Sequence, residues 1–315
     1  MDKVGVAIEK LIADSLVLHK ESFIIPALIP ETKIEYVLQN MLAQNPELFF
    51  VNGFKLKYSY LSTTIYPSYI CSKSESDEIL YLCRRKARQL TDRCQGPGDY
   101  SKVLQAHDLL ARNVVYKRGS SQELHTIVGS LINKQGVCEG FAKALKYLLD
   151  IMSIPSVLVY GYGYTGNAGN KEAHTWNLVR FGNDWIHVDV TFDTTIRNGQ
   201  ALRYDYFGLS DNQILKDHEF DLKKYPAALK TDYEFYLRNG LVMYTKKQMN
   251  AFVSNALHDG RQDVIFKLPG KSCDEKILQI IIDEIQNLLE QQRINVQYTV
   301  DCNLSQGVFH INFNY

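Results

Sequence analysis

Apolar residues recur at steps of three and four along the first part of the chain, which is the spacing of one face of an α-helix. Over residues 4–19 that face is formed by Val4, Ile8, Leu11, Ile12 and Leu16. The same spacing predicts helices over 31–42 and 74–94. Between them, residues 49–69 are rich in aromatics and threonine, and Asn52-Gly53 is a turn dipeptide typical of a β-hairpin. Residues 1–98 are therefore expected to form a mainly helical segment.

A Gly-Pro-Gly sequence at 96–98 breaks this pattern and begins a second region. Helical spacing returns over 100–115 and again over 141–152, whose apolar stripe holds Phe141, Ala144, Leu145, Leu148, Leu149 and Met152. Two alternating runs, 173–181 and 184–191, flank a Gly-Asn turn and predict a second hairpin. These elements define a core domain at 99–228.

From Tyr233 onward a third region restarts as strands and helices in alternation. Strands are expected over 235–244, 263–268, 294–300 and 308–314, and helices over 246–258 and 274–291. The boundary lies near Pro226 to Asp232. A small, separate α+β domain is therefore expected at 232–315.

The composition narrows the range of partners without identifying one. The 315 residues include 35 Lys+Arg and 35 Asp+Glu, so the formal net charge is +0 and nothing global attracts nucleic acid or an anionic membrane. Hydrophobic residues make up 45% and charged residues 22%, as in a globular chain. We therefore expect neither a nucleic-acid-binding protein nor a membrane protein.

The cysteines and the N-terminus indicate a compartment. The six cysteines include no C-x-x-C pair and are too few for a disulfide scaffold. Glu9, Lys10 and Asp14 interrupt the apolar residues of the N-terminus, where a secretory signal or a membrane span needs an unbroken apolar run. We expect a cytoplasmic protein whose cysteines are free thiols.

Cys138 is a candidate nucleophile because it lies at or just inside the N-terminus of the helix expected over 141–152. The partial positive charge of a helix N-terminus favours the reactive thiolate, although a buried structural cysteine is the ordinary alternative. If the Gly-Asn dipeptide forms the hairpin turn, His174 and Asp189 share one face as diagonal neighbours, about 7–8 Å apart at the backbone. A register slip of one residue would separate them. Cys, His and Asp so placed predict acyl transfer by a catalytic triad.

Three blocks of sequence carry a family resemblance. They are Gly136–Lys143 around the cysteine, Ala173–Asn177 around the histidine and Trp185–Asp193 around the aspartate. In this order they resemble the transglutaminase-like superfamily, a papain-like group that includes transglutaminases, bacterial cysteine proteases and peptide N-glycanases. The flanking segments His107–Leu110, Tyr206–Asp211 and Asp217-His218 are similar to bacterial transglutaminase-domain proteins. The resemblance covers about residues 100–218.

This resemblance implies an α+β, papain-like core in which the helix carrying Cys138 packs on an antiparallel sheet. It implies Cys138 as nucleophile, His174 as general base and acid, and Asp189 as the residue that orients the histidine. One position departs from the pattern, because Ile132 stands where papain relatives have the glutamine that binds the oxyanion. The backbone N–H of Cys138 and the side chain of Gln135 are the remaining candidates, and an incomplete oxyanion hole would lower the rate by about 10²–10³.

Two other motifs suggest ligands that we do not expect. Residues 161–166 formally match G-x-G-x-x-G, but the chain continues into a loop and a strand rather than the helix that a dinucleotide site needs. His187 shares a strand face with Asp189 and, with His174, offers an alternative zinc site. The triad uses the same residues more simply, so neither a cofactor nor a metal is expected.

Five further side chains have structural interpretations. His107, His125 and His218 are expected to be buried or capping histidines. Trp176 is expected to form a wall that shields the His–Asp pair from water. Asp193 is expected to cap a turn, and it replaces Asp189 in the triad if Asp189 points away.

Taken together, these patterns predict a cysteine hydrolase, most simply a cysteine protease, that cleaves peptide or protein amides through an acyl-enzyme. A transglutaminase performs the same first half-reaction and differs only in using an amine instead of water as acceptor. A catalytically inactive binding or scaffold protein that retains the fold is the third hypothesis. The C-terminal domain is a candidate surface for a protein partner.

Overall fold

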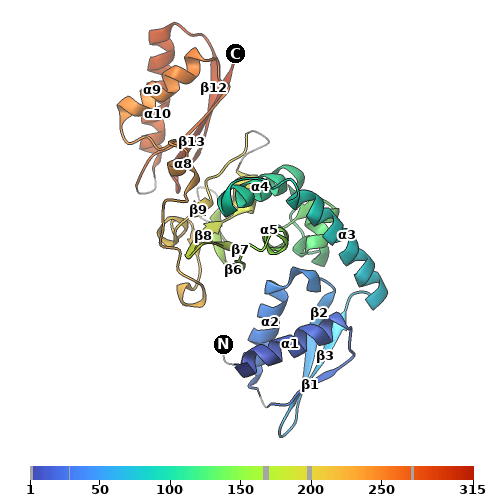
Figure 1. The fold of residues 1–315 in the computed structure, drawn as a ribbon. Helices are drawn as coiled ribbons and strands as arrows, with labels where there is room; N and C mark the ends of the chain where they lie inside the picture. Colours follow the sequence, from blue (N-terminus) through green and yellow to red (C-terminus); the bar gives the residue numbers. More distant parts are fainter. Residues whose placement is uncertain (1–2, 28, 166–169, 197–200, 271–272) are drawn as a thin grey trace. The chain divides into compact units, whose positions relative to one another are not determined.

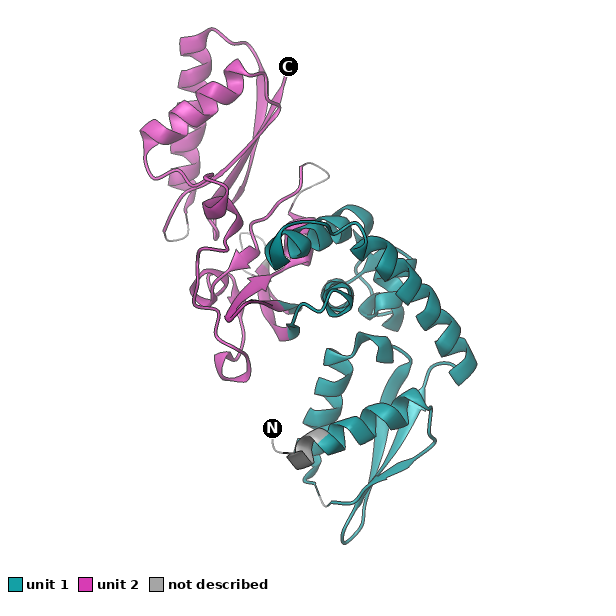
Figure 2. Cartoon of the chain, in the orientation of Figure 1, with its two compact units in different colours: residues 1–158, 175–177 teal, residues 159–174, 178–315 magenta. Residues whose placement is uncertain are grey.

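The structure, a computed structural model, describes residues 3–27, 29–165, 170–196, 201–270 and 273–315. The chain forms two compact units, one made of residues 1–158 and 175–177 and the other of residues 159–174 and 178–315 (Figure 2). Helices occur beside sheets of three, five, three and two strands. This confirms the expected α+β class. In the described part of the chain, no helix is long and apolar enough to cross a membrane.

The first part of unit 1 combines helices with a three-stranded antiparallel sheet (Figure 1). Its elements are α1 (Lys3–Val17), β1 (Phe23–Ile25), α2 (Glu31–Gln44), η1 (Pro46–Leu48), β2 (Val51–Tyr58) and β3 (Thr63–Tyr69). The expected hairpin is present, but Asn52 and Gly53 lie at a bulge inside β2 and do not form its turn. The turn falls at 59–62 instead, where the Ser59 N–H donates to the Ser62 carbonyl over 2.9 Å.

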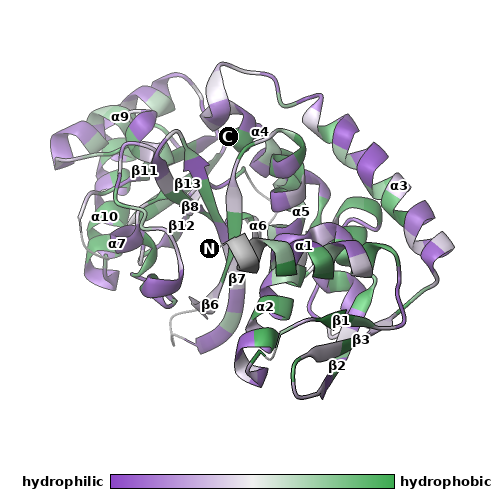
Figure 3. Cartoon of the chain, turned by 60° about the horizontal axis from the view of Figure 1, so that its bottom comes forward, coloured by the Kyte–Doolittle hydropathy of each residue, from purple (hydrophilic) through white to green (hydrophobic). Residues whose placement is uncertain are grey.

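The remainder of unit 1 is mainly helical and surrounds α5. Its elements are α3 (Lys73–Thr91), α4 (Gly98–Asn113), β4 (Val115–Tyr116), η2 (Gln122–His125), η3 (Val128–Ile132), β5 (Gln135–Gly136) and α5 (Cys138–Ile151). Figure 3 shows α3 banded in hydrophilic and hydrophobic colours, as expected for a helix with one buried face. In α5 the predicted stripe is buried, with Phe141, Leu145 and Leu148 all at 0% exposure, so this helix is part of the core of unit 1.

Unit 2 begins with most of a five-stranded sheet in the order β10-β6-β7-β8-β9. The elements of this part are β6 (Ser156–Thr165), β7 (Asn170–Phe181), β8 (Asp184–Val188), α6 (Val190–Thr195), β9 (Phe207–Leu209), α7 (Asp211–Ile214), β10 (His218–Glu219) and η4 (Leu222–Lys224). The hairpin of β7 and β8 turns at Gly182, whose φ of 59° lies in the left-handed region that glycine adopts readily. Its second strand is shorter than expected, because the chain leaves β8 after Val188 and enters α6.

The C-terminal subdomain, residues 235–315, sets two long helices beside an antiparallel sheet in the order β11-β13-β12 (Figure 1). Its elements are α8 (Phe235–Arg238), α9 (Lys246–His258), β11 (Asp263–Lys267), α10 (Glu275–Gln292), β12 (Gln297–Asn303) and β13 (Val308–Asn314). The bounds of α9 and β13 match the prediction. The strand expected at 235–244 is wrong, because the Glu234 carboxylate accepts the N–H groups of Tyr236 and Leu237 and thereby starts α8.

Candidate active site

Cys138 is the first residue of α5, which confirms its expected place at a helix N-terminus. The close approach of α5 to η2 depends on Gly140, since a Cβ there would lie 2.3 Å from the carbonyl oxygen of Leu124. That same carbonyl accepts the N–H of Val137 over 3.1 Å. The Gly-Val-Cys-Glu-Gly sequence therefore holds the start of the helix, and with it the thiol, against a fixed piece of backbone.

All six cysteines are free thiols, as predicted. Burial raises the pKa of five of them, and for Cys83 it raises the pKa to about 12. The other four with a raised pKa are Cys71, Cys94, Cys273 and Cys302. Because the thiolate is the reactive form, these five thiols are poor nucleophiles near neutral pH.

His174 and Asp189 lie in direct contact in unit 2. His174 is in β7 and is 7% exposed, and its Nε2 lies 2.5 Å from Oδ2 of Asp189, which is 1% exposed. Asp189 reaches the histidine from the N-cap of α6 rather than from the strand in which it was expected. Its Oδ1 accepts the N–H groups of Thr191 and Phe192 over 3.0 and 3.1 Å. One oxygen therefore starts a helix while the other binds the imidazole.

A second imidazole, that of His218, also binds Asp189. Its Nε2 lies 3.2 Å from the same Oδ2. Burial alone raises the pKa of the Asp189 carboxyl, but the charge and hydrogen bond of His174, together with those of His218, outweigh it and lower the pKa below its ordinary value. His218 is buried as expected, but its contact with Asp189 was missed. The only sequence signal near it was the resemblance of the Asp217-His218 flank.

Gly163 leaves the space that the rings of this site occupy. It lies in β6, where its backbone pairs with His218 of β10. A Cβ at this position would lie 2.6 Å from Cζ of Phe192 and 3.4 Å from Cγ of His174. The ring of Phe192 packs 4.5 Å from that of His174, centroid to centroid. This glycine of the G-x-G-x-x-G motif therefore serves ring packing within a strand that continues to Thr165, and Gly166 lies outside the described residues.

The structure does not bring His187 together with His174 and Asp189, the three residues of the alternative zinc site. His187 is buried and points to Asp211, with Nε2 2.9 Å from Oδ1, and burial lowers its pKa. Among the described residues, the one group with metal-ligand chemistry is His174, Asp189 and His218. Two ligands about 2.0–2.1 Å from a tetrahedral zinc lie about 3.3 Å apart. The 2.5 Å between Nε2 of His174 and Oδ2 of Asp189 is shorter than that and corresponds to a direct hydrogen bond between the two side chains.

The remaining candidates have local partners. Asp193 accepts the backbone N–H of Tyr206 over 3.1 Å, so it joins two segments of unit 2 and does not replace Asp189. Gln135, a candidate oxyanion donor, accepts a hydrogen bond from Lys117 at its Oε1 over 3.1 Å. Ile132, which stands where papain relatives have the oxyanion-binding glutamine, is the last residue of η3. Trp176 is 1% exposed. His107 is buried beside Asp108, as expected for a structural histidine.

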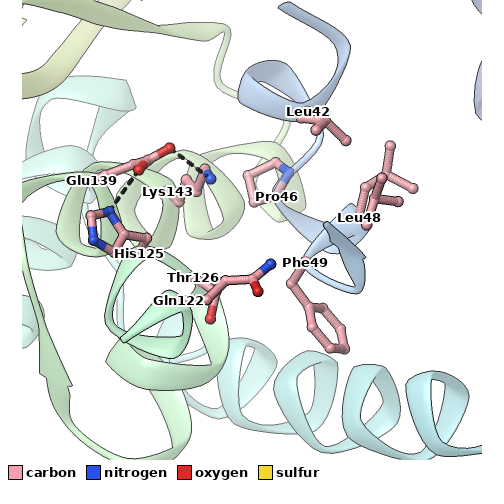
Figure 4. Close-up of a pocket in the computed structure, with 10 residues that line it drawn as sticks. Leu42, Pro46, Leu48, Phe49, Gln122, His125, Thr126, Glu139 and Lys143 are labelled. Atoms are coloured by element: carbon pink, nitrogen blue, oxygen red, sulfur yellow. Dashed lines mark hydrogen bonds and ion pairs between the residues drawn. The ribbon is translucent and has the colours of Figure 1, made fainter. Parts of the chain in front are cut away.

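A pocket of about 180 Å³ lies in unit 1 beside the first turns of α5 (Figure 4). Leu42, Pro46, Leu48 and Phe49 form one side of it. On the other side Glu139 binds both His125, over 2.9 Å, and Lys143, over 2.8 Å. His125, expected to be buried or capping, is instead 39% exposed at this pocket. The volume is below the roughly 300–1,000 Å³ of a small-molecule site, so we assign no ligand to it.

Comparison with known proteins identifies a family match over about a third of the chain. Residues 84–190 match the transglutaminase-like superfamily. No curated protein sequence gives a significant match. The solved structures that resemble the chain include a proposed cysteine protease from Cytophaga hutchinsonii, with 18% identity over 44% of this chain and 62% of that chain and a TM-score of 0.30.

Two further solved structures are similar to parts of the chain. A TGase shares 12% identity over 58% of this chain and 53% of its own, with a TM-score of 0.32. The periplasmic domain of TgpA from Pseudomonas aeruginosa shares 19% identity over 42% of this chain and 56% of its own, with a TM-score of 0.28. The chain thus spans between 53% and 62% of the length of these three structures.

Proposed function

We propose that this chain, whose residues 84–190 belong to the transglutaminase-like superfamily, is a cysteine hydrolase that cleaves peptide or protein amides. The proposal assigns Cys138 as nucleophile, His174 as general base and acid, and Asp189 as the residue that orients the imidazole. The observation that carries it is the buried His174–Asp189 hydrogen bond, two residues of the predicted triad that lie in contact.

The contact between His174 and Asp189 defines the tautomer of the histidine. An ionised carboxylate only accepts hydrogen bonds, so Nε2 of His174 carries the proton that it donates to Asp189. Nδ1 is then the nitrogen that exchanges a proton with the nucleophile. Because the Asp189 carboxylate is fixed by two backbone N–H groups, it holds the ring in one orientation.

The reaction proceeds in two half-reactions. The Cys138 thiolate attacks the amide carbon and forms a C–S bond, and collapse of the tetrahedral oxyanion breaks the C–N bond while protonated His174 gives its proton to the leaving amine. Water then attacks the thioester, His174 accepts its proton, and the C–S bond breaks to release the acid. The backbone N–H of Cys138 has no acceptor within its own helix and serves as one oxyanion donor.

A buried hydrogen bond joins α5 to the part of β7 that belongs to the same unit. Asn177, three residues after His174 in this strand, donates from Nδ2 to the carbonyl of Ala142 over 2.9 Å. Ala142 is four residues after Cys138, one turn along α5.

The reactivity of Cys138 toward iodoacetamide tests the proposal without a known substrate. Each site is quantified by mass spectrometry at pH 6, in the wild type and in His174→Ala, with Cys71 as internal control because it also lies near the surface. We expect Cys138 to react at least about tenfold faster than Cys71, and the difference to vanish in the variant. Equal rates at both sites in both proteins would refute the triad and favour a scaffold.

A second assay separates hydrolysis from amine transfer. A denatured protein substrate is incubated with the wild type and with Cys138→Ala, with and without a primary amine at millimolar concentration. New carboxyl termini that depend on Cys138 support the hydrolase. Products that carry the amine in place of a released group, with no hydrolysis, would show a transglutaminase instead.

A further inference from the structure

We propose that His218, Asp217 and Gln306 are positioning residues for the His174–Asp189 pair, so that the C-terminal subdomain completes the active site. The inference rests on the proposed function. All three residues lie outside the segment that matches the transglutaminase-like superfamily, which ends at residue 190. Together with Tyr206 and Asn303 we call them the rear network.

His218 connects the proposed catalytic pair to a second carboxylate. Its Nε2 faces Oδ2 of Asp189 at 3.2 Å, and its Nδ1 faces Oδ1 of Asp217 at 2.8 Å. The imidazole and both carboxylates are almost completely buried. Each ring nitrogen of His218 therefore faces one carboxylate, and the imidazole bridges the two.

Asp217 is held in turn by groups that donate to it. The hydroxyl of Tyr206 donates to Oδ2 over 2.8 Å, and Nε2 of Gln306 lies 3.2 and 3.1 Å from the two oxygens. Nδ2 of Asn303 donates to the Tyr206 hydroxyl over 3.0 Å. These contacts fix the position of the Asp217 carboxylate and, through it, the orientation of the His218 ring.

Two members of the rear network come from the C-terminal subdomain. Asn303 is the last residue of β12, and Gln306 lies in the turn before β13. Gln306 is completely buried, and its Oε1 has no hydrogen-bond partner while its Nε2 serves Asp217. An unpartnered buried carbonyl destabilises the fold. Nε2 of Gln306, which also donates to the carbonyl of Gln213 over 3.1 Å, is thus the group through which this residue binds Asp217.

A second buried connection fixes the same subdomain to the sheet. Arg203 and Asp205, in the segment before β9, form a bidentate ion pair at 3.0 and 2.8 Å. The hydroxyl of Tyr236 in α8 donates to Asp205 over 2.8 Å. The turn that carries Gln306 therefore approaches Asp217 from a subdomain that is anchored at another point as well.

The rear network affects the proton affinity of His174 through charge. The titratable and charged groups that face His218 are Asp189, Asp217, His174, Tyr206 and, more distantly, His187. His218 and His174 bind the same oxygen of Asp189, so the contact with His218 takes up part of the negative charge that otherwise acts on His174. Replacing the His218 imidazole leaves more of that charge to His174, so the protonated form of His174 persists to higher pH.

Two variants test the proposal from opposite ends of the network. His218→Gln removes the imidazole but retains an amide donor, and Gln306→Leu removes the donor to Asp217 at similar volume. The control is His310→Gln, which removes another buried histidine, paired with Asp263 over 2.7 Å in the C-terminal subdomain. Two readouts are taken: Cys138 labelling by iodoacetamide at pH 6, and the titration of His174 by NMR of histidine Cε1–H, assigned with His174→Ala.

The expected results differ for the variants and the control. In His218→Gln the midpoint of the His174 titration rises by about one pH unit, which is a tenfold change in proton affinity. In Gln306→Leu, Cys138 labelling falls by about tenfold, while His310→Gln leaves both readouts at the wild-type value. A purely structural role would lower the unfolding midpoint of all three variants without moving the titration of His174.

The outcomes that overturn the inference are distinct from those that overturn the proposed function. Selective Cys138 labelling in the wild type, unchanged in both network variants together with the His174 titration, refutes the rear network and leaves the triad intact. Absence of selective labelling in the wild type refutes the triad. The His174 titration in His218→Gln then decides alone whether His218 acts on this histidine.

Discussion

Asp189 is the residue whose removal most directly tests how the site is held together. Its carboxylate accepts two backbone N–H groups of α6 at one oxygen and two imidazoles at the other. Asp189→Ala therefore removes a helix cap and two charge-assisted hydrogen bonds at once. It also leaves two buried imidazoles without their common acceptor.

The magnitude follows from the separate contributions. Loss of an N-cap costs about 1 kcal/mol, and each hydrogen bond to a charged group contributes about 1.5–3 kcal/mol. Breaking a buried ion pair by removing one partner costs about 3–5 kcal/mol in total, so the contributions are not additive. We expect Asp189→Ala to lower the free energy of unfolding by about 4 kcal/mol.

Urea denaturation measures this loss, followed by far-UV circular dichroism and by tryptophan fluorescence. The two tryptophans of the chain, Trp176 and Trp185, lie in β7 and β8, so fluorescence reports on the sheet beside Asp189. Asp274→Ala is the matched control, because Asp274 caps α10 through Ile277 and is exposed. It should lose about 1 kcal/mol. A loss in Asp189→Ala no larger than in this control would refute the contribution of the two imidazoles.

Three further results are expected. The pKa of Asp189 is lower in the folded than in the unfolded chain, so the ionised carboxylate stabilises the fold fully above the unfolded-state pKa of about 3.9, and this stabilisation is lost as the pH falls. Urea midpoints measured from pH 6 to pH 3 should therefore fall more steeply in the wild type than in Asp189→Asn. Parallel curves for the two proteins would contradict this. Gly163→Ala places a Cβ 2.6 Å from the Phe192 ring, so it should lower the free energy of unfolding by about 1–3 kcal/mol and slow Cys138 labelling. In Gly53→Ala the new Cβ would lie 3.6 Å from its nearest atom, so this control should be close to neutral in the same unfolding and labelling assays. Burial raises the pKa of Cys83 to about 12, so this thiol should remain unlabelled by iodoacetamide at pH 8 until urea unfolds the chain, and rapid labelling of the native protein would contradict its burial.

The elements predicted best from sequence are those whose signals are local. α9 and β13 were located to the residue, because apolar periodicity and caps act within a few positions. The strand expected after Glu234 failed because one capping carboxylate outweighed an aromatic composition typical of strands. Asp189 was predicted to be a diagonal neighbour of the histidine on the same face of the hairpin, but the prediction missed that a helix cap, not a strand, would carry it.

The rear network lay beyond sequence reasoning for a different reason. Asp189 and His218 are 29 residues apart, and Asp217 and Gln306 are 89 apart. No periodicity or motif relates residues at such separations. The sequence also does not distinguish a buried histidine or glutamine that belongs to the network from one that does not. Tertiary packing alone brings them together, so the pair predicted from the hairpin was found and its support was not.

The β12–β13 turn also sets the order in which the site can be assembled during synthesis. The 89 residues between Asp217 and Gln306 take about 4–18 s to make at about 5–20 residues per second. Throughout that interval a nascent chain already holds His174, Asp189 and His218 but lacks the amide that holds Asp217. The proposed reactive groups are therefore synthesised before Gln306, which holds Asp217 in place. We expect a chain that ends before Gln306 to be less reactive at this site than the full chain.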